Sequence, residues 1–174
     1  MTLFRQGDLD GLCGVYALIN AVEIIAPRPE AHVHTMMKAC VHALYIRNGS
    51  PFFFLQGIGF HEMITLLRMV VRPNFSIAYK RPFARNAGVT LGEYWKICRA
   101  FLDEDGRTVI TVLAANNIQH WTVVAAMTDR CLFLMDSDGL NRVKRTEITV
   151  RPGKVKRLYR IFPSQTFFLF KAKG

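Results

Sequence analysis

Three side chains of this sequence could together form the machinery of a thiol enzyme: Cys13, His120 and Asp136. A thiol near neutral pH is mostly protonated, so it becomes a nucleophile only beside an imidazole or at a helix N-terminus. The imidazole in turn needs its second nitrogen held, and a carboxylate does this well. Gln6, upstream of the thiol, could donate its side-chain N–H to an oxyanion together with the backbone N–H of Cys13.

The position of Cys13 depends on the helix that is expected over residues 11–26, which are mostly apolar. Asp10 and Gly11 stand where a helix cap is expected, so the thiol would fall in the first turn, where backbone N–H groups stabilise negative charge. We interpret Asp8 and Asp10 as residues that cap and solvate this loop rather than bind substrate.

His120 and Asp136 are expected at one edge of a β-hairpin. Residues 120–127 and 131–136 have strand patterns, and the three residues from Thr128 form the turn between them. Asp138 is a rival for the role of orienting the imidazole, because residues 136–139, Asp-Ser-Asp-Gly, are also a good turn sequence. We favour Asp136 because it directly ends the apolar strand.

The order of these residues resembles that of the papain-like cysteine peptidases: a Gln, a Cys at a helix start, a His at a strand start and an Asp on the next strand. The run from Asp10 to Gly14, the pair His120-Trp121 and residues 136–139 are most similar to compact bacterial peptidases of the bacteriocin-leader type. Residues 56–61, which precede an expected helix, are also similar to the glycine-led helix start of that group. Cys13 is followed by Gly-Val-Tyr, not by the Trp-containing signature of lysosomal papain relatives.

The resemblance implies a papain-like α+β fold, in which N-terminal helices, including a central Cys helix, pack on a C-terminal antiparallel sheet. It also implies hydrolysis of a peptide, amide or isopeptide bond through an acyl-enzyme, with Cys13 as nucleophile, His120 as base, Asp136 as orienter and Gln6 in the oxyanion hole. Two alternatives stay open: a glutamine deamidase or amide transferase that uses the same thioester, and a non-catalytic basic interaction module.

The hydrophobic periodicity independently predicts an α+β chain, with helices first and strands afterwards. A capping box of Thr90 and Glu93 marks the start of the last helix. The expected helices cover residues 11–26, 30–46, 60–71 and 91–103, and the expected strands cover 108–114, 120–127, 131–136, 142–150, 155–162 and 166–171.

Length and composition fit one domain over residues 1–174, with 51% hydrophobic residues and no linker or repeat. No apolar run approaches the roughly 18 residues of a membrane span, and no signal peptide is recognisable. We therefore expect a cytoplasmic protein at synthesis, with export by a signal-independent route left open.

The remaining cysteines and histidines indicate neither a disulfide framework nor a metal site. Cys40 and Cys98 lie in apolar helical stripes and are expected in the core. His61 lacks a second histidine four positions later, where Thr65 stands, so the zinc-protease motif is absent. We expect no metal and no cofactor.

Positive charge is concentrated at the C-terminal end of the chain. The net charge is +10, and residues 141–174 hold ten Lys and Arg against Glu147 alone. This charge could attract an acidic partner, or it could protect edge strands from pairing. No nucleic-acid motif accompanies it, and the aromatic residues there alternate as in core strands, which argues against nucleic-acid binding. The expected partner is a protein or peptide substrate, which could be acidic.

Overall fold

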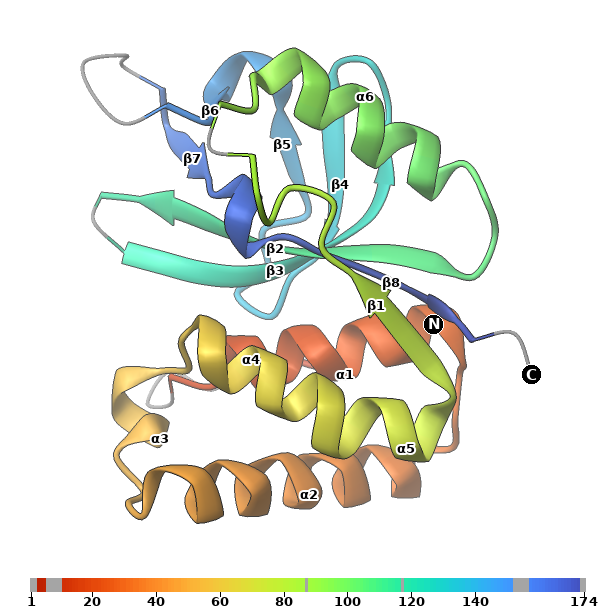
Figure 1. Cartoon of the computed structure of the whole chain (residues 1–174), viewed down its shortest axis with the longest axis vertical. Coiled ribbons are helices and arrows are strands. Elements are labelled where there is room, and N and C mark those ends of the chain that lie inside the picture. The colour runs from red at the N-terminus through yellow and green to blue at the C-terminus, as the bar shows by residue number, and fades with distance from the viewer. Residues whose placement is uncertain (1–2, 6–10, 87, 117, 152–156, 173–174) are drawn as a thin grey trace.

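The computed structural model of the protein describes residues 3–5, 11–86, 88–116, 118–151 and 157–172. Within them the chain has an α+β fold, as predicted, with most helices in the N-terminal half and an antiparallel sheet in the C-terminal half (Figure 1). The helical elements are α1 (Cys13–Ile25), α2 (Glu30–Asn48), α3 (Phe53–Gln56), α4 (Phe60–Leu66), a π-helical turn (Leu67–Val71), α5 (Arg72–Phe75) and α6 (Leu91–Leu102).

The strands form one twisted sheet in the order β1-β8-β2-β3-β4-β5, in which all neighbours are antiparallel. Strand β7 pairs with the end of β2 and, in parallel, with the short β6. The bounds are β1 (Ile77–Lys80), β2 (Arg107–Ala115), β3 (Ile118–Met127), β4 (Cys131–Met135), β5 (Arg142–Lys144), β6 (Ile148–Thr149), β7 (Tyr159–Ile161) and β8 (Phe167–Lys171).

Side chains of successive strand residues point to opposite faces, so the sheet separates two hydrophobic cores. In β2, Ile110 and Val112 belong to the core shared with α1, α2 and α4, whereas Val109 and Leu113 belong to the core under α6. Helix α1 packs against β2 and β3 on one side and against α2 on the other, as Figure 1 shows. The helix that begins with Cys13 is therefore fixed between two layers.

One irregularity interrupts the pairing of β3 with β4. Val124 pairs with Leu134, whereas Ala126 pairs with Phe133, so Ala125 is an extra residue in β3. This is a β-bulge, which shifts the register of the two strands by one residue.

The predicted helix over residues 60–71 is not regular throughout, because α4 ends at Leu66 and a π-helical turn follows. Pro73, in α5, explains the change. Its ring nitrogen has no hydrogen to donate, and the ring crowds the carbonyl group of Met69, so regular hydrogen bonding cannot run through this segment.

The predicted strand over residues 142–150 is wrong in its middle. Strand β5 ends at Lys144, and a 3₁₀ turn over Arg145–Glu147 separates it from β6. The Glu147 carboxylate accepts a hydrogen bond from the Lys144 backbone N–H at 2.9 Å, which stabilises the turn.

One other strand prediction differs from the structure, and one strand of the structure was not predicted. Of the strand expected over residues 155–162, β7 covers Tyr159–Ile161, and residues 155 and 156 lie outside the described ones. Strand β1 was not predicted, because four residues after Ser76, whose φ is 52°, are too short for a periodic signal.

The predicted capping box of α6 is confirmed. The Thr90 hydroxyl accepts a hydrogen bond from the Glu93 backbone N–H at 3.2 Å, and the Glu93 carboxylate accepts one from the Thr90 backbone N–H at 2.8 Å.

Of the helices among the described residues, none combines the length and apolar character needed to cross a bilayer.

A buried side chain on α1 holds the N-terminal segment. Asn20 accepts a hydrogen bond from the Phe4 backbone N–H at 3.0 Å through its amide oxygen, and its amide nitrogen donates to the Phe4 carbonyl at 3.1 Å. The backbone of Phe4 is thereby fixed two residues before Gln6.

Candidate active site

Cys13 is the first residue of α1 and is half-buried. The first N–H groups of a helix lack intrahelical partners, so they stabilise a thiolate at this position. The predicted cap is wrong: the cap position is Leu12, whose side chain makes no capping hydrogen bond. Gly11 is instead held outside the helix, because its N–H donates to the carbonyl group of Phe54. Asp8 and Asp10 lie outside the described residues.

The glycine after Cys13 is required by close packing. A Cβ atom on Gly14 would lie 2.4 Å from Cγ1 of Ile58 and 3.1 Å from Cδ1 of Trp121. Trp121 is buried, and its indole N–H donates to the Ile58 carbonyl at 2.8 Å. Trp121 follows His120 in β3, so the close approach of Gly14 to Trp121 and Ile58 fixes the start of α1 against the strand that carries the histidine.

A pair of glycines brings the loop before Cys13 against the loop after α3. A Cβ atom on Gly11 would lie 2.6 Å from the backbone nitrogen of Gly57, and Gly57 has a φ of +79°. Only glycine adopts that conformation at no steric cost. The segment that follows, Ile58-Gly59, leads into α4, where Glu62 accepts a hydrogen bond from the Gly59 N–H at 3.1 Å.

His120 and Asp136 form a hydrogen-bonded pair, with 2.8 Å between Nε2 of the imidazole and Oδ2 of the carboxylate. The Asp136 side chain is 0% exposed and that of His120 is 18% exposed. The other carboxylate oxygen, Oδ1, accepts hydrogen bonds from the backbone N–H groups of Asp138 at 2.9 Å and Leu140 at 3.4 Å. The turn after β4 thus fixes the plane of the carboxylate.

Charge and hydrogen bonding favour an ionised pair. Burial lowers the pKa of His120, but hydrogen bonds to Asp136 and Cys13, together with their charges, outweigh burial and raise this pKa from 6.5 to about 10. Burial also acts to raise the pKa of Asp136, yet the hydrogen bond to His120 and its charge bring this pKa below 3.8. The Cys13 thiol therefore lies close enough to the imidazole to influence its charge. Because Asp136 holds Nε2, Nδ1 is the nitrogen left for the thiol.

Of the four residues predicted for the site, the structure brings together Cys13, His120 and Asp136, and Gln6 lies outside the described residues. The rival Asp138 is exposed and contributes its backbone N–H to Asp136. The sequence reasoning missed the role of Trp121. Its position beside His120 was a signal, but the partner of its indole N–H, 63 residues away, was not visible in the sequence.

Within the described ranges of the chain, the other chemically active side chains do not gather into a second centre of this kind. Cys40 and Cys98 are buried, and burial raises the pKa of the Cys40 thiol to about 12. In the part of the chain that the structure describes, no three His, Cys, Asp or Glu residues are placed to hold a metal ion.

Comparisons of the chain with protein-family models, curated proteins and solved structures find no significant match in any of the three. The inference of function therefore depends on the geometry of this chain.

Proposed function

We propose that the protein is a papain-like cysteine hydrolase, which cleaves a peptide, amide or isopeptide bond through an acyl-enzyme on Cys13. One observation carries the proposal: His120 contacts the buried Asp136 through Nε2 at 2.8 Å and lies within reach of a thiol at the start of a helix. An activated nucleophile is recognised by this order of contacts, in which the nucleophile contacts a base and the base is held by an orienting group. The packing of the Cys helix on an antiparallel sheet that carries His and Asp on adjacent strands supports a papain-like arrangement.

In the first half-reaction, the Cys13 thiolate attacks the carbonyl carbon of the substrate and forms a C–S bond. The C–N bond then breaks, and the amine leaves with a proton from Nδ1 of the His120 imidazolium. Asp136 stays ionised and holds the ring through Nε2. The product on the protein is a thioester.

Negative charge on the substrate oxygen needs hydrogen-bond donors during this step. The backbone N–H of Cys13 is one candidate, because it is at the first position of α1, where helix N–H groups have no intrahelical partner. The side chain of Gln6 is the second proposed donor.

In the second half-reaction, water gives a proton to His120 and attacks the thioester carbonyl. The C–S bond breaks, the thiolate of Cys13 is restored, and the acid product leaves. A glutamine side-chain amide as substrate, or an amine in place of water, would turn the same machinery into a deamidase or an amide transferase.

The test combines an electrophilic peptide probe with intact-protein mass spectrometry. One covalent adduct is expected on the unmodified protein and none on Cys13→Ala, whereas Cys131→Ala, the matched control at the other half-buried thiol, should react normally. Labelling that survives Cys13→Ala would contradict the proposal. Candidate peptides are then analysed for cleavage, for conversion of an amide to an acid, and for incorporation of an added amine. These three products distinguish the hydrolase from the deamidase and the amide transferase.

A further inference from the structure

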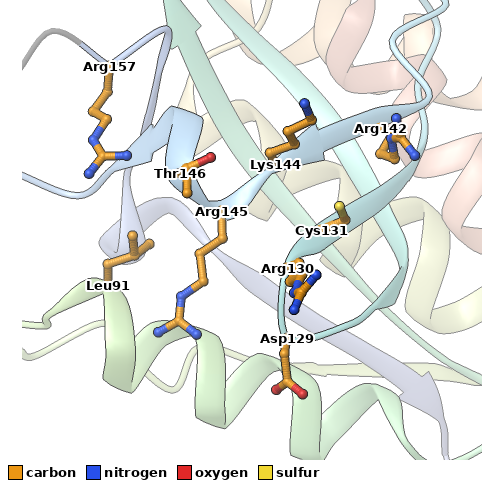
Figure 2. A pocket seen from close by; sticks show the side chains of 9 residues that line it. All are labelled: Leu91, Asp129, Arg130, Cys131, Arg142, Lys144, Arg145, Thr146 and Arg157. Carbon is orange, nitrogen blue, oxygen red and sulfur yellow. The ribbon is translucent and has the colours of Figure 1, made fainter.

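A depression of about 550 Å³ lies away from the candidate active site and is lined by cations (Figure 2). We call it the cationic pocket. Its positive side chains are Arg130, Arg142, Lys144, Arg145 and Arg157, and the other residues that line it are Leu91, Asp129, Cys131 and Thr146.

Protection of an edge strand does not explain this set. Strand β5 is at the end of the strand order, and its Arg142 and Lys144 flank the buried Val143, as expected of residues that discourage pairing with another chain. However, Arg130 lies in the turn between β3 and β4, and Arg157 lies before β7. Separate segments of the chain thus bring cations to one depression, as Figure 2 shows.

The positive charge of the pocket is not neutralised from within. Among the residues that line the pocket, Asp129 carries a carboxylate, and this carboxylate already forms an ion pair with Arg99 of α6. Among the described residues, none of the five cations forms an ion pair with a carboxylate. Like charges held close together repel one another, and a bound anion would relieve that repulsion.

One of the cations, Arg145, is held in place before any ligand binds, and its backbone is tied to that of Arg130. The Arg145 guanidinium lies over the ring of Trp95, 5.2 Å from its centroid, and the buried indole N–H donates to the Thr128 carbonyl at 2.7 Å. The backbone N–H of Arg145 donates to the Arg130 carbonyl at 2.7 Å. Groups that are already ordered lose less conformational entropy when a ligand binds.

We propose that the cationic pocket binds a compact polyphosphate anion, meaning a ligand with two or more linked phosphate groups. Four of the five cations are arginines, whose forked N–H groups match phosphate oxygens in pairs. The volume falls within the range of about 300–1,000 Å³ that is typical of small-ligand sites, which suits a compact anion better than an extended chain.

This site is independent of the proposed hydrolase. Cys131, in the pocket, begins β4, and Asp136 follows the end of that strand. At about 3.3 Å for each strand residue, the two sites lie on the order of 16 Å apart. Loss of either activity would leave the other testable.

The first test is calorimetric titration of the full chain with tripolyphosphate. Saturable binding is expected, and Arg130→Gln with Arg142→Gln should weaken it roughly tenfold or more, since each removes charge-assisted hydrogen bonds. The matched control is Arg28→Gln with Arg72→Gln, an equal loss of charge at exposed positions outside the pocket. Equal weakening by both pairs, or no saturation at millimolar tripolyphosphate, would overturn the proposal. So would tighter binding of citrate or of a short DNA duplex.

The second test needs no change in the pocket and uses Cys131, which pairs with Lys144 in the sheet. In a Cys13→Ser protein, saturating tripolyphosphate should slow alkylation of Cys131 by iodoacetamide several-fold, because the bound anion covers the thiol. Unchanged alkylation of Cys131 at saturation would place the anion elsewhere and overturn the assignment.

Discussion

Asp136 reaches His120 diagonally across two strands and not from the directly opposite position. Val123 pairs with Met135, and the same register continued by one residue brings Thr122 opposite Asp136. His120 is two residues before Thr122 and so shares its face, and diagonal neighbours in an antiparallel pair are still within reach of long side chains. The 2.8 Å hydrogen bond uses this diagonal.

The diagonal predicts different effects for the two aspartates of the turn. Asp136→Ala should lower kcat/KM by about a hundredfold or more, and by less than Cys13→Ala, because nucleophile and base remain. Asp138→Ala should leave kcat/KM close to normal, since the exposed side chain is removed and the N–H that donates to Asp136 is kept. Steady-state kinetics on a cleaved peptide would measure this. A damaging Asp138→Ala with a silent Asp136→Ala would reverse the two roles.

Thiol reactivity should distinguish Cys13 from the other cysteines of the folded protein. Iodoacetamide should label Cys13 first, because it has both a helix start and the imidazole of His120 beside it. Cys40 and Cys98 should label last, because both are buried. Peptide mapping at short times measures the order. Labelling of Cys131 as fast as that of Cys13 would count against thiol activation by His120.

Stability should depend on pH through the His120–Asp136 pair. Because the pKa of His120 is raised on folding, its contribution to the free energy of unfolding is fully present below pH 6.5 and is lost as pH rises through about 10. The lowered pKa of Asp136 makes its contribution present above pH 3.8 and lost as pH falls through the folded-state value.

Urea unfolding across pH tests this directly. The free energy of unfolding lost in Asp136→Asn should be largest between pH 3.8 and 6.5 and should shrink on both sides. Asp138→Asn is the control, and its small effect should not follow this window. A loss in Asp136→Asn that does not vary with pH would contradict an ionised pair.

Two glycines at the second position of a helix offer a matched comparison. Gly14→Ala should destabilise the protein by about 1–3 kcal/mol despite the better helix propensity of alanine, because the new Cβ overlaps the buried Ile58. In Gly92→Ala the nearest atoms lie 3.9 Å away, so this change should stabilise the protein by up to about 1 kcal/mol. Chemical denaturation measures both. The double variant Gly14→Ala with Ile58→Ala should lose less than the sum of its single variants, and strict additivity would exclude the overlap.

The link between α1 and the N-terminal segment can be tested at Asn20. Asn20→Ala removes both hydrogen bonds to Phe4 and should cost about 1–2 kcal/mol of unfolding free energy. If Gln6 donates to the oxyanion, Asn20→Ala should also lower kcat, and this loss should largely disappear in a Gln6→Ala background. If Asn20→Ala lowers kcat equally in the unmodified and the Gln6→Ala protein, the hydrogen bonds to Phe4 do not act through Gln6.

The sequence predicted what local chemistry determines. The capping box at Thr90 and the strand before Asp136 depend on neighbouring residues, so their patterns are visible in the chain. Contacts between distant segments were not predictable in this way. The overlap that requires Gly14, and the hydrogen bond from Trp121 to Ile58, arise only when helix, loop and strand meet. The cationic pocket likewise combines segments that are separate in the sequence.

The bulge at Ala125 determines which residue of β3 lies opposite Asp136. On the far side of the bulge, Ala126 pairs with Phe133, and the same register continued without a bulge would bring Val123 opposite Asp136. The carboxylate would then point to the face of Val123, away from His120. A homologue that keeps Ala125 must therefore keep the bulge to preserve the pair. Deletion of Ala125 alone would leave Ala126 paired with Phe133 and Val124 with Leu134, now without a bulge, so Thr122 would stay opposite Asp136 and a single deletion should be tolerated at this point during evolution.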